Sequence, residues 1–266
     1  MRVTRVSVVR HSTRRRQAIR RRTLWTGGEL LVTLGVVLLL LVAHQLWWTN
    51  RQAQHNAARE VRALEREWGT ATPSAPATDA APSAAPTQDG GQDSAGQDST
   101  GQERKSAVNS TRTQPSWSQA YAILTIPRLG LRVPVAEGIS KQDVLNKGYV
   151  GHYEDTQQPG QAGNFALAGH RNTHGEPFRY INRLKRGDEI SVETEAALYT
   201  YTVDKTLPQT SAGDGGVIGA VPRSTAKPAH GYSEPGNYIT LTTCTPEYTS
   251  KYRLVVWGKL TSTRPK

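Results

Sequence analysis

An uninterrupted apolar run near the N-terminus is the strongest pattern in the chain. Residues 30–48 read LLVTLGVVLLLLVAHQLWW, nineteen positions without a formal charge. A helix that crosses the roughly 30 Å hydrocarbon core of a bilayer needs about 20 such residues. The run therefore predicts a transmembrane helix. A cleaved signal peptide would be followed by a small-residue cleavage site, which is absent here, and a buried core helix would need a large surrounding domain.

Apolar residues continue at helical spacing beyond that run. Within residues 49–68, Ala53, Ala57, Val61, Leu64 and Trp68 recur at intervals of three and four, with charged residues between them. The spacing predicts a juxtamembrane helix that continues the first one. A stripe this thin is typical of a solvated helix; pairing with a partner helix and lying on the lipid surface are the alternatives.

Residues 69–116 lack any helical or strand pattern. The segment consists mainly of Ala, Pro, Ser, Thr, Gly, Gln and Asp, and it contains no aromatic residue, Leu or Ile. Such a composition cannot bury enough apolar surface to offset the entropy lost on ordering. We expect a disordered linker with a root-mean-square span of roughly 40 Å, which would let the following domain range through the layer next to the membrane.

The remaining residues, 117–266, show short apolar runs of the β type, separated by Gly and Pro. These runs cover residues 121–126, 131–136, 164–168, 189–193, 199–207, 238–243 and 252–260. Many short strands with turn signals between them predict an all-β domain, either a β-sandwich or a closed barrel. Only residues 140–146 and 177–184 resemble single turns or short helices.

The distribution of charge predicts the orientation of the membrane helix. The chain has 266 residues and a net charge of +11, and nine arginines but only one acidic residue fall within residues 1–50. Because basic residues flank the cytoplasmic end of a membrane helix, residues 1–29 are expected in the cytoplasm and the β domain outside. Nucleic-acid binding by the arginine run would need a folded domain to shape it, and the sequence offers none there.

The single cysteine, Cys244, is the first candidate for chemistry. One cysteine excludes an intramolecular disulfide and any multi-cysteine metal site. It follows the apolar run 238–243 and precedes Thr245 and Pro246, so the thiol lies where a strand gives way to a loop. Loops on a rigid scaffold often carry functional groups. The alternative is a buried, inert thiol in a β-barrel binding or adhesion module displayed on a stalk.

A nucleophilic thiol needs a neighbouring base or cation. The domain offers His152, His170, His174 and His230, all of which precede Cys244, so a papain-like order is excluded. His170 also ends an apolar run, at 164–168, whereas His174 and His230 stand in Gly-rich or Pro-rich loops and are predicted to be ordinary surface histidines.

Arg253 begins the run 252–260. If this strand pairs antiparallel with the strand of Cys244, the guanidinium returns within reach of the thiol, where it could donate to an oxyanion. The alternative is a surface arginine in a salt bridge.

These motifs together resemble a known family. Residues 121–260 resemble the sortases, the cysteine transpeptidases of Gram-positive cell surfaces. The resemblance rests on four motifs: TLTTCTP, YRLVVWG, NFALAGHR and IPRLGLRVPV. The T-L-x-T-C motif with an arginine nine residues later is specific to that family. The AGHR context, the GHY at 151–153 and the N-terminal anchor with a long linker are similar to class E sortases of actinobacteria.

The resemblance implies a function as well as a fold. The fold would be a closed eight-stranded barrel with Cys244 as nucleophile, His170 as general acid and base, and Arg253 holding the substrate carbonyl and its oxyanion. Tyr153, which would read the second position of the signal, and Thr243 are the candidate substrate-binding residues. No clear acidic calcium cluster is present, so neither a metal nor another cofactor is expected.

The implied reaction joins a secreted protein to the cell wall. A Leu-Pro-x-Thr-Gly or Leu-Ala-x-Thr-Gly sorting signal would be cut between Thr and Gly, and a thioester would form. An amine of peptidoglycan or its lipid-linked precursor would then resolve the thioester. The expected partners are therefore signal-bearing secreted proteins, peptidoglycan and the membrane, but not nucleic acid.

Overall fold

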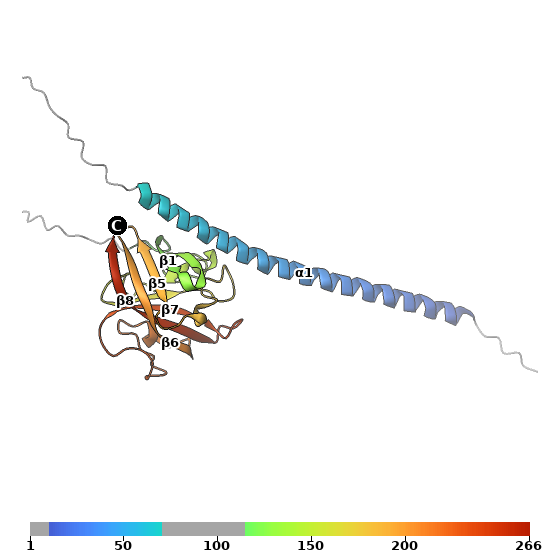
Figure 1. The fold of residues 1–266 in the computed structure, drawn as a ribbon. Coiled ribbons are helices and arrows are strands. Elements are labelled where there is room, and N and C mark those ends of the chain that lie inside the picture. Colours follow the sequence, from blue (N-terminus) through green and yellow to red (C-terminus); the bar gives the residue numbers. More distant parts are fainter. Residues whose placement is uncertain (1–10, 71–114) are drawn as a thin grey trace, which may run out of the picture.

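A long N-terminal helix and a β-barrel make up the protein (Figure 1). The structure, a computed structural model, describes residues 11–70 and 115–266. Helix α1 spans His11–Thr70 and therefore contains both the apolar run and the stripe that follows it. Most of the segment expected to be a disordered linker, residues 71–114, lies outside the described residues, and residues 69 and 70 belong to α1.

Eight strands close into a barrel in the order β1-β2-β3-β4-β7-β8-β6-β5. All neighbouring pairs are antiparallel except β2–β3 and β4–β7, which are parallel. The all-β prediction and the closed eight-stranded barrel are confirmed. The strands are β1 (Ala120–Ile126), β2 (Leu131–Glu137), β3 (Val150–His152), β4 (Gly163–Ala168), β5 (Glu189–Thr194), β6 (Ala197–Ser211), β7 (Asn237–Thr245) and β8 (Tyr252–Pro265).

The structure differs from the sequence pattern in its shortest elements. Strand β3 has only three residues, too few to show an alternation of apolar and polar positions, and the pattern misses it. The segments 140–146 and 177–184, predicted as single turns or short helices, each contain a single 3₁₀ turn, η2 (Leu145–Lys147) and η3 (Ile181–Arg183). Gly148 follows η2 at φ +86°, a left-handed conformation that ends the turn. Two further turns are η1 (Pro127–Leu129) and η4 (Gly215–Ile218).

The barrel interior holds the main hydrophobic core. In β7, Ile239 and Leu241 point inward, whereas Thr240 and Thr242 lie on the outer face, as the period of two requires. The segment between β6 and β7 covers part of that outer face, and Trp257 Nε1 donates a hydrogen bond to the Val217 carbonyl at 3.0 Å. Other inward members of the core are Ala122, Leu124, Ile126, Val135, Phe165, Leu167 and Val256.

The barrel lies beside the C-terminal part of α1 (Figure 1), and the helical stripe packs against it. Ala57 and Leu64 are buried against outward-facing apolar residues of β1 and β2, among them Ile123 and Ala136. The stripe is therefore not a solvated face, because the outer face of the barrel supplies its partner. The preceding part of α1 instead exposes its Leu, Val and Trp side chains.

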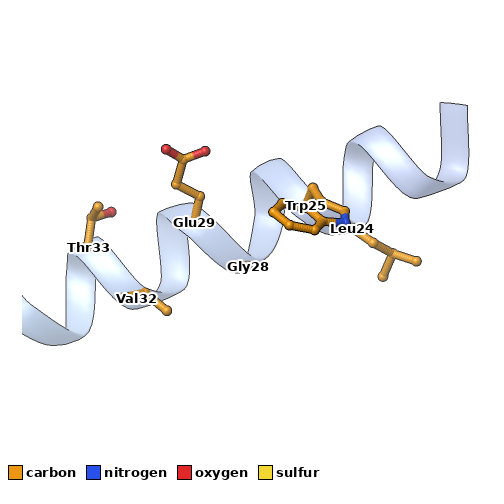
Figure 2. A pocket seen from close by; sticks show the side chains of 6 residues that line it. All are labelled: Leu24, Trp25, Gly28, Glu29, Val32 and Thr33. Atoms are coloured by element: carbon orange, nitrogen blue, oxygen red, sulfur yellow. The ribbon is translucent and has the colours of Figure 1, made fainter. Parts of the chain in front are cut away.

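One helix in the described part of the chain is long and apolar enough to cross a membrane. It is the α1 segment Leu24–Gly69, whose most apolar window has a mean hydropathy of 2.2 and no burial within the protein. Figure 2 shows the residues that line a hollow on the exposed surface of this segment. The lining residues are Leu24, Trp25, Gly28, Glu29, Val32 and Thr33. The hollow belongs to the apolar helix, and the strand ends that carry the candidate chemistry take no part in it.

Candidate active site

Three neighbouring strands bring the predicted thiol, imidazole and guanidinium to one end of the barrel. In the parallel β4–β7 pair, Ala168 lies opposite Thr242. His170 lies two residues after Ala168, and Cys244 lies two residues after Thr242. Both therefore stand at the same end of the barrel. In the antiparallel β7–β8 pair, Cys244 lies directly opposite Arg253. The expectation that β8 returns the arginine to the cysteine is met by this register.

Cys244 is the second-last residue of β7 and lies on its outward face. It shares the outward face with Thr240 and Thr242, which are buried, whereas Cys244 itself is partly exposed and forms no disulfide. A partly exposed thiol at a strand end is accessible to a substrate carbonyl, unlike an inert thiol in a core.

His170 is held as a neutral base. Its Nε2 lies 2.9 Å from Asn146 Oδ1, and a neutral ring that donates to this oxygen has Nδ1 as its acceptor. Burial, together with the nearby His174 and Lys141, lowers the pKa of His170 from 6.5 to about 4. The ring of His174 lies 5.3 Å from that of His170. At neutral pH the imidazole can therefore accept a proton.

The Arg253 guanidinium is anchored to its own loop. Nη1 donates hydrogen bonds to the carbonyl oxygens of Ser250, at 2.9 Å, and Tyr252, at 3.1 Å. These two bonds restrict the motion of the guanidinium.

Arg171 connects the histidine loop to the cysteine strand. The side chain is buried, and Nη1 donates to the Cys244 carbonyl at 3.1 Å and to Thr245 Oγ1 at 2.8 Å. The backbone of His170 is also fixed, since Phe178 N–H donates to its carbonyl at 3.0 Å. Gly169 permits this closure: a Cβ there would lie 2.7 Å from the Phe178 ring.

Sequence reasoning assigned no role to Arg171 or Asn146. Arg171 carried a usable signal, because it follows His170 directly in the AGHR motif. Asn146 carried none, since it stands in a different loop and meets His170 only through the fold.

The two candidate substrate-binding residues lie in different surroundings. Thr243 is buried, and its hydroxyl donates to the Gly169 carbonyl at 2.8 Å, so its side chain holds the histidine loop. Tyr153 follows β3, is partly exposed, and its hydroxyl lies 3.2 Å from Thr242 Oγ1. Since Thr242 precedes Cys244 on the same face of β7, Tyr153 lies beside the thiol's own strand, whereas the Thr243 hydroxyl is turned to the neighbouring loop.

The other histidines fall into three environments. His152 is buried on β3, where Nδ1 contacts Glu137 Oε2 at 2.9 Å, so it is a structural residue. His230 is exposed. The prediction of an ordinary surface histidine is wrong for His174, which is half-buried beside His170 and has its pKa lowered by burial. Its loop folds back onto the barrel, and the Gly-rich sequence alone does not show this.

No group of three or more His, Cys, Asp or Glu side chains within residues 11–70 and 115–266 is arranged to hold a metal ion. A thiol, a neutral imidazole and an anchored guanidinium at one end of a closed barrel instead define a centre suited to acyl transfer through cysteine.

Comparison with known proteins agrees with this class. Residues 124–261 match the model of the sortase domain family. The chain is 42% identical over 246 residues to Sortase SrtE1 of Streptomyces coelicolor, covering 90% of this chain and 57% of that protein's length. It is 32% identical to Sortase SrtE2 of the same organism, covering 89% of this chain and 81% of the relative. The chain therefore belongs to the sortase family, the cysteine transpeptidases.

Solved structures show the same barrel. The crystal structure of Sortase E1 from Streptomyces coelicolor, with a tripeptide in its active site, matches at a TM-score of 0.53 and 52% identity, over 57% of this chain and 94% of that one. The SrtF sortase from Corynebacterium diphtheriae matches at a TM-score of 0.52 and 29% identity, over 58% of this chain and 91% of that one. The resemblance to class E sortases is thereby confirmed.

Proposed function

We propose that this chain is a membrane-anchored cysteine transpeptidase. It cleaves an LPXTG-like or LAXTG-like sorting signal between Thr and Gly through a thioester, and it transfers the signal-bearing protein to an amine of peptidoglycan or its lipid-linked precursor. The observation that supports the proposal most is the register of β4, β7 and β8. Cys244 pairs with Arg253, and Ala168 and Thr242, which lie two residues before His170 and Cys244, pair with each other.

The first half-reaction uses all three groups. The Cys244 sulfur attacks the carbonyl carbon of the signal threonine while neutral His170 takes the thiol proton. Arg253 donates to the oxygen that becomes an oxyanion. The C–N bond to glycine then breaks, His170 returns the proton to the departing amine, and a thioester remains on Cys244.

The second half-reaction restores the enzyme. The acceptor amine attacks the thioester carbonyl, Arg253 again donates to the oxyanion, and His170 takes a proton from the attacking nitrogen. The C–S bond breaks as the new amide forms, and His170 returns the proton to the Cys244 sulfur. The lowered pKa of His170 leaves the ring neutral at the start of each half-reaction, so it is free to accept the first proton.

The alternative of a binding or adhesion module is less well supported. It needs Cys244 to be an inert core residue, but the thiol is partly exposed and stands opposite Arg253. A thiol-reactive probe separates the two, because a catalytic cysteine is labelled quickly in the native state and a buried one slowly.

The placement of the enzyme follows from α1. With the arginine-rich end in the cytoplasm, the apolar segment crosses the membrane once and the barrel lies outside, where the signal-bearing proteins and the wall are. The exposed apolar side chains between residues 24 and 48 support this, because water is a poor environment for so many of them.

Turnover of a fluorogenic sorting-signal peptide tests the proposed function. We expect the wild-type chain to cleave the peptide and Cys244→Ala to release no product, with a peptide of reversed sequence as the control. Undiminished turnover by Cys244→Ala would contradict the proposal.

A further inference from the structure

We propose that residues 50–68 of α1, here called the docking segment, hold the barrel with its active-site end against the lipid surface. The inference rests on the proposed crossing of the membrane by the preceding part of α1. It adds to the proposed function an orientation of the barrel, in which the Cys244 thiol lies at the level of the lipid headgroups.

The middle of the docking segment is an apolar interface. Ala57, Val61 and Leu64 are each at most 6% exposed and share a cluster with Ile123 and Ala136 on the outer face of the barrel. Small side chains on the helix let the two backbones approach closely. The alanines of the stripe, which look weak as a hydrophobic pattern, therefore fit a close contact between helix and barrel.

A glycine of the barrel marks the closest approach. A Cβ on Gly148 would lie 2.6 Å from the Ala53 carbonyl oxygen, a distance that a side chain cannot adopt. Gly148 also has a φ of +86°, which favours glycine independently. Because η2 ends at this glycine, the loop that carries Asn146, the hydrogen-bond partner of His170, lies directly against the helix.

Polar contacts fix both ends of the docking segment. At its start, Asn50 Oδ1 accepts a hydrogen bond from Gly175 N–H at 2.6 Å, and Gln54 Nε2 lies 3.5 Å from the Gly175 carbonyl. At its other end, Arg132 Nη1 donates to Glu65 Oε1 at 2.7 Å. There the Lys266 ammonium also lies 4.3 Å from the centre of the Trp68 ring. The contacts therefore run along about 27 Å of helix.

The direction of the helix decides which end of the barrel faces the membrane. Asn50 is two residues beyond Trp48, about 3 Å along the helix axis, and Trp48 ends the apolar run. Asn50 touches Gly175, which directly follows His174 in the loop after His170. The opposite end of the helix meets Lys266, beyond the far end of β8. The active-site end of the barrel is therefore the end nearest the membrane.

The rim of the active site has the chemistry of a headgroup contact. Tyr180 and Tyr248 are 41% and 75% exposed, and the Arg183 guanidinium lies 3.9 Å above the Tyr180 ring. Arg179 donates to the Tyr248 hydroxyl at 3.2 Å, although it also pairs with Glu176. Exposed tyrosines with arginines beside them are favoured at the interface, where the rings lie among headgroups and the cations meet anionic phosphates.

The lone cysteine makes the orientation directly measurable. The full chain, labelled with a fluorophore at Cys244, would be placed in lipid nanodiscs that contain nickel-chelating headgroups as quenchers. If the active-site end lies at the lipid surface, nickel should quench most of the fluorescence. Labelling needs no turnover, so the result is independent of the proposed reaction.

A matched pair of variants separates docking from mere tethering. Ala57→Glu places a carboxylate in the apolar interface, and we expect nickel quenching to fall to less than about half of its wild-type value as the barrel leaves the helix. Ala58→Glu, the same change on the neighbouring exposed position, should quench like the wild type.

Two results would overturn the inference. Weak quenching of the wild-type chain would show that the thiol is far from the lipid, whether or not any variant folds. Equal quenching of wild type and Ala57→Glu, with unchanged melting of the barrel in both, would show that the docking segment does not set the orientation. Formation of an acyl-enzyme by the unlabelled chain in the same nanodiscs would leave the proposed function standing in either case.

Discussion

Cys244 and Arg253 are direct partners across the antiparallel β7–β8 pair. Their Cα atoms face each other at the end of the sheet, and the bonds of the guanidinium to the Ser250 and Tyr252 carbonyls keep it on the loop between the strands. This relationship places a cationic residue opposite the cysteine, and it makes the proposed role of the arginine testable apart from the fold.

Arg253→Ala should slow transfer without unfolding the barrel. Removing one donor to an oxyanion lowers kcat by about 10²–10³-fold, and we expect a loss in that range because the arginine acts mainly in the transition state. Steady-state kinetics with a sorting-signal peptide measure it. Arg264→Ala, at an exposed position of β8 far from the thiol, is the matched control. An Arg253→Ala enzyme with wild-type kcat and melting temperature would remove the arginine from the mechanism.

His174→Gln should move the pKa of His170 upward. In the wild type, burial and the neighbouring His174 and Lys141 hold that pKa at about 4 rather than 6.5, so His170 stays neutral down to about pH 4. Without the second imidazole, protonation begins at higher pH, and the base is lost earlier on acidification. Burial, the largest cause, remains in the variant, so its pKa rises only part of the way to 6.5. Activity at pH values between the two pKa values should therefore fall in the variant and persist in the wild type.

An NMR titration of the His170 ring gives the matching measurement. Lys141→Gln should shift the same pKa in the same direction, since it also removes a nearby positive charge. Identical His170 titrations in wild type and both variants would contradict this electrostatic account.

Arg171→Met should weaken both the fold and the reaction. The variant leaves the Cys244 carbonyl and the Thr245 hydroxyl without their charged donor. Hydrogen bonds from charged groups contribute about 1.5–3 kcal/mol, so the free energy of unfolding should drop by about that amount in a denaturant titration. The kcat should fall as well, because Cys244 loses a restraint. A variant as stable and as fast as the wild type would show that the contact is incidental.

Tyr153→Ala tests which side chain reads the second position of the signal. Because Tyr153 lies over Thr242 on the face of β7 that leads to Cys244, its removal should alter the ratio of kcat/KM between LAXTG-like and LPXTG-like peptides. Competition between the two peptides measures that ratio. Tyr153→Phe, which keeps the ring, is the control for the hydroxyl. An unchanged ratio in Tyr153→Ala would assign the selection to another residue.

The sequence predicted those parts of the fold that have a long enough pattern. Seven strands of five residues or more show apolar runs, whereas β3 has three residues and shows none. Closure of the barrel followed from the resemblance, since the pattern of apolar residues fits a sandwich equally well. The docking of α1 was missed because its stripe is rich in alanine, and its partner surface, which includes Ile123 and Ala136, lies on two strands far along the chain.

Some residues of the candidate site could be predicted from the sequence and others could not. Cys244, His170 and Arg253 could be proposed from the sequence because each stands at or next to one end of an apolar run in a recognisable motif. Asn146 and the burial of His174 could not, because they depend on how loops from different parts of the chain fold against each other. Contacts of this kind leave no periodic signal in a single sequence.

The most direct test of the central claim is the intact mass of the protein after incubation with sorting-signal peptides that vary at position two. We expect the mass to rise by that of the peptide up to and including its threonine, with the adduct on Cys244, and to return to its starting value when an amine acceptor is added. Cys244→Ala should show no adduct. An unmodified wild-type chain, or an adduct that also forms on Cys244→Ala, would contradict the account.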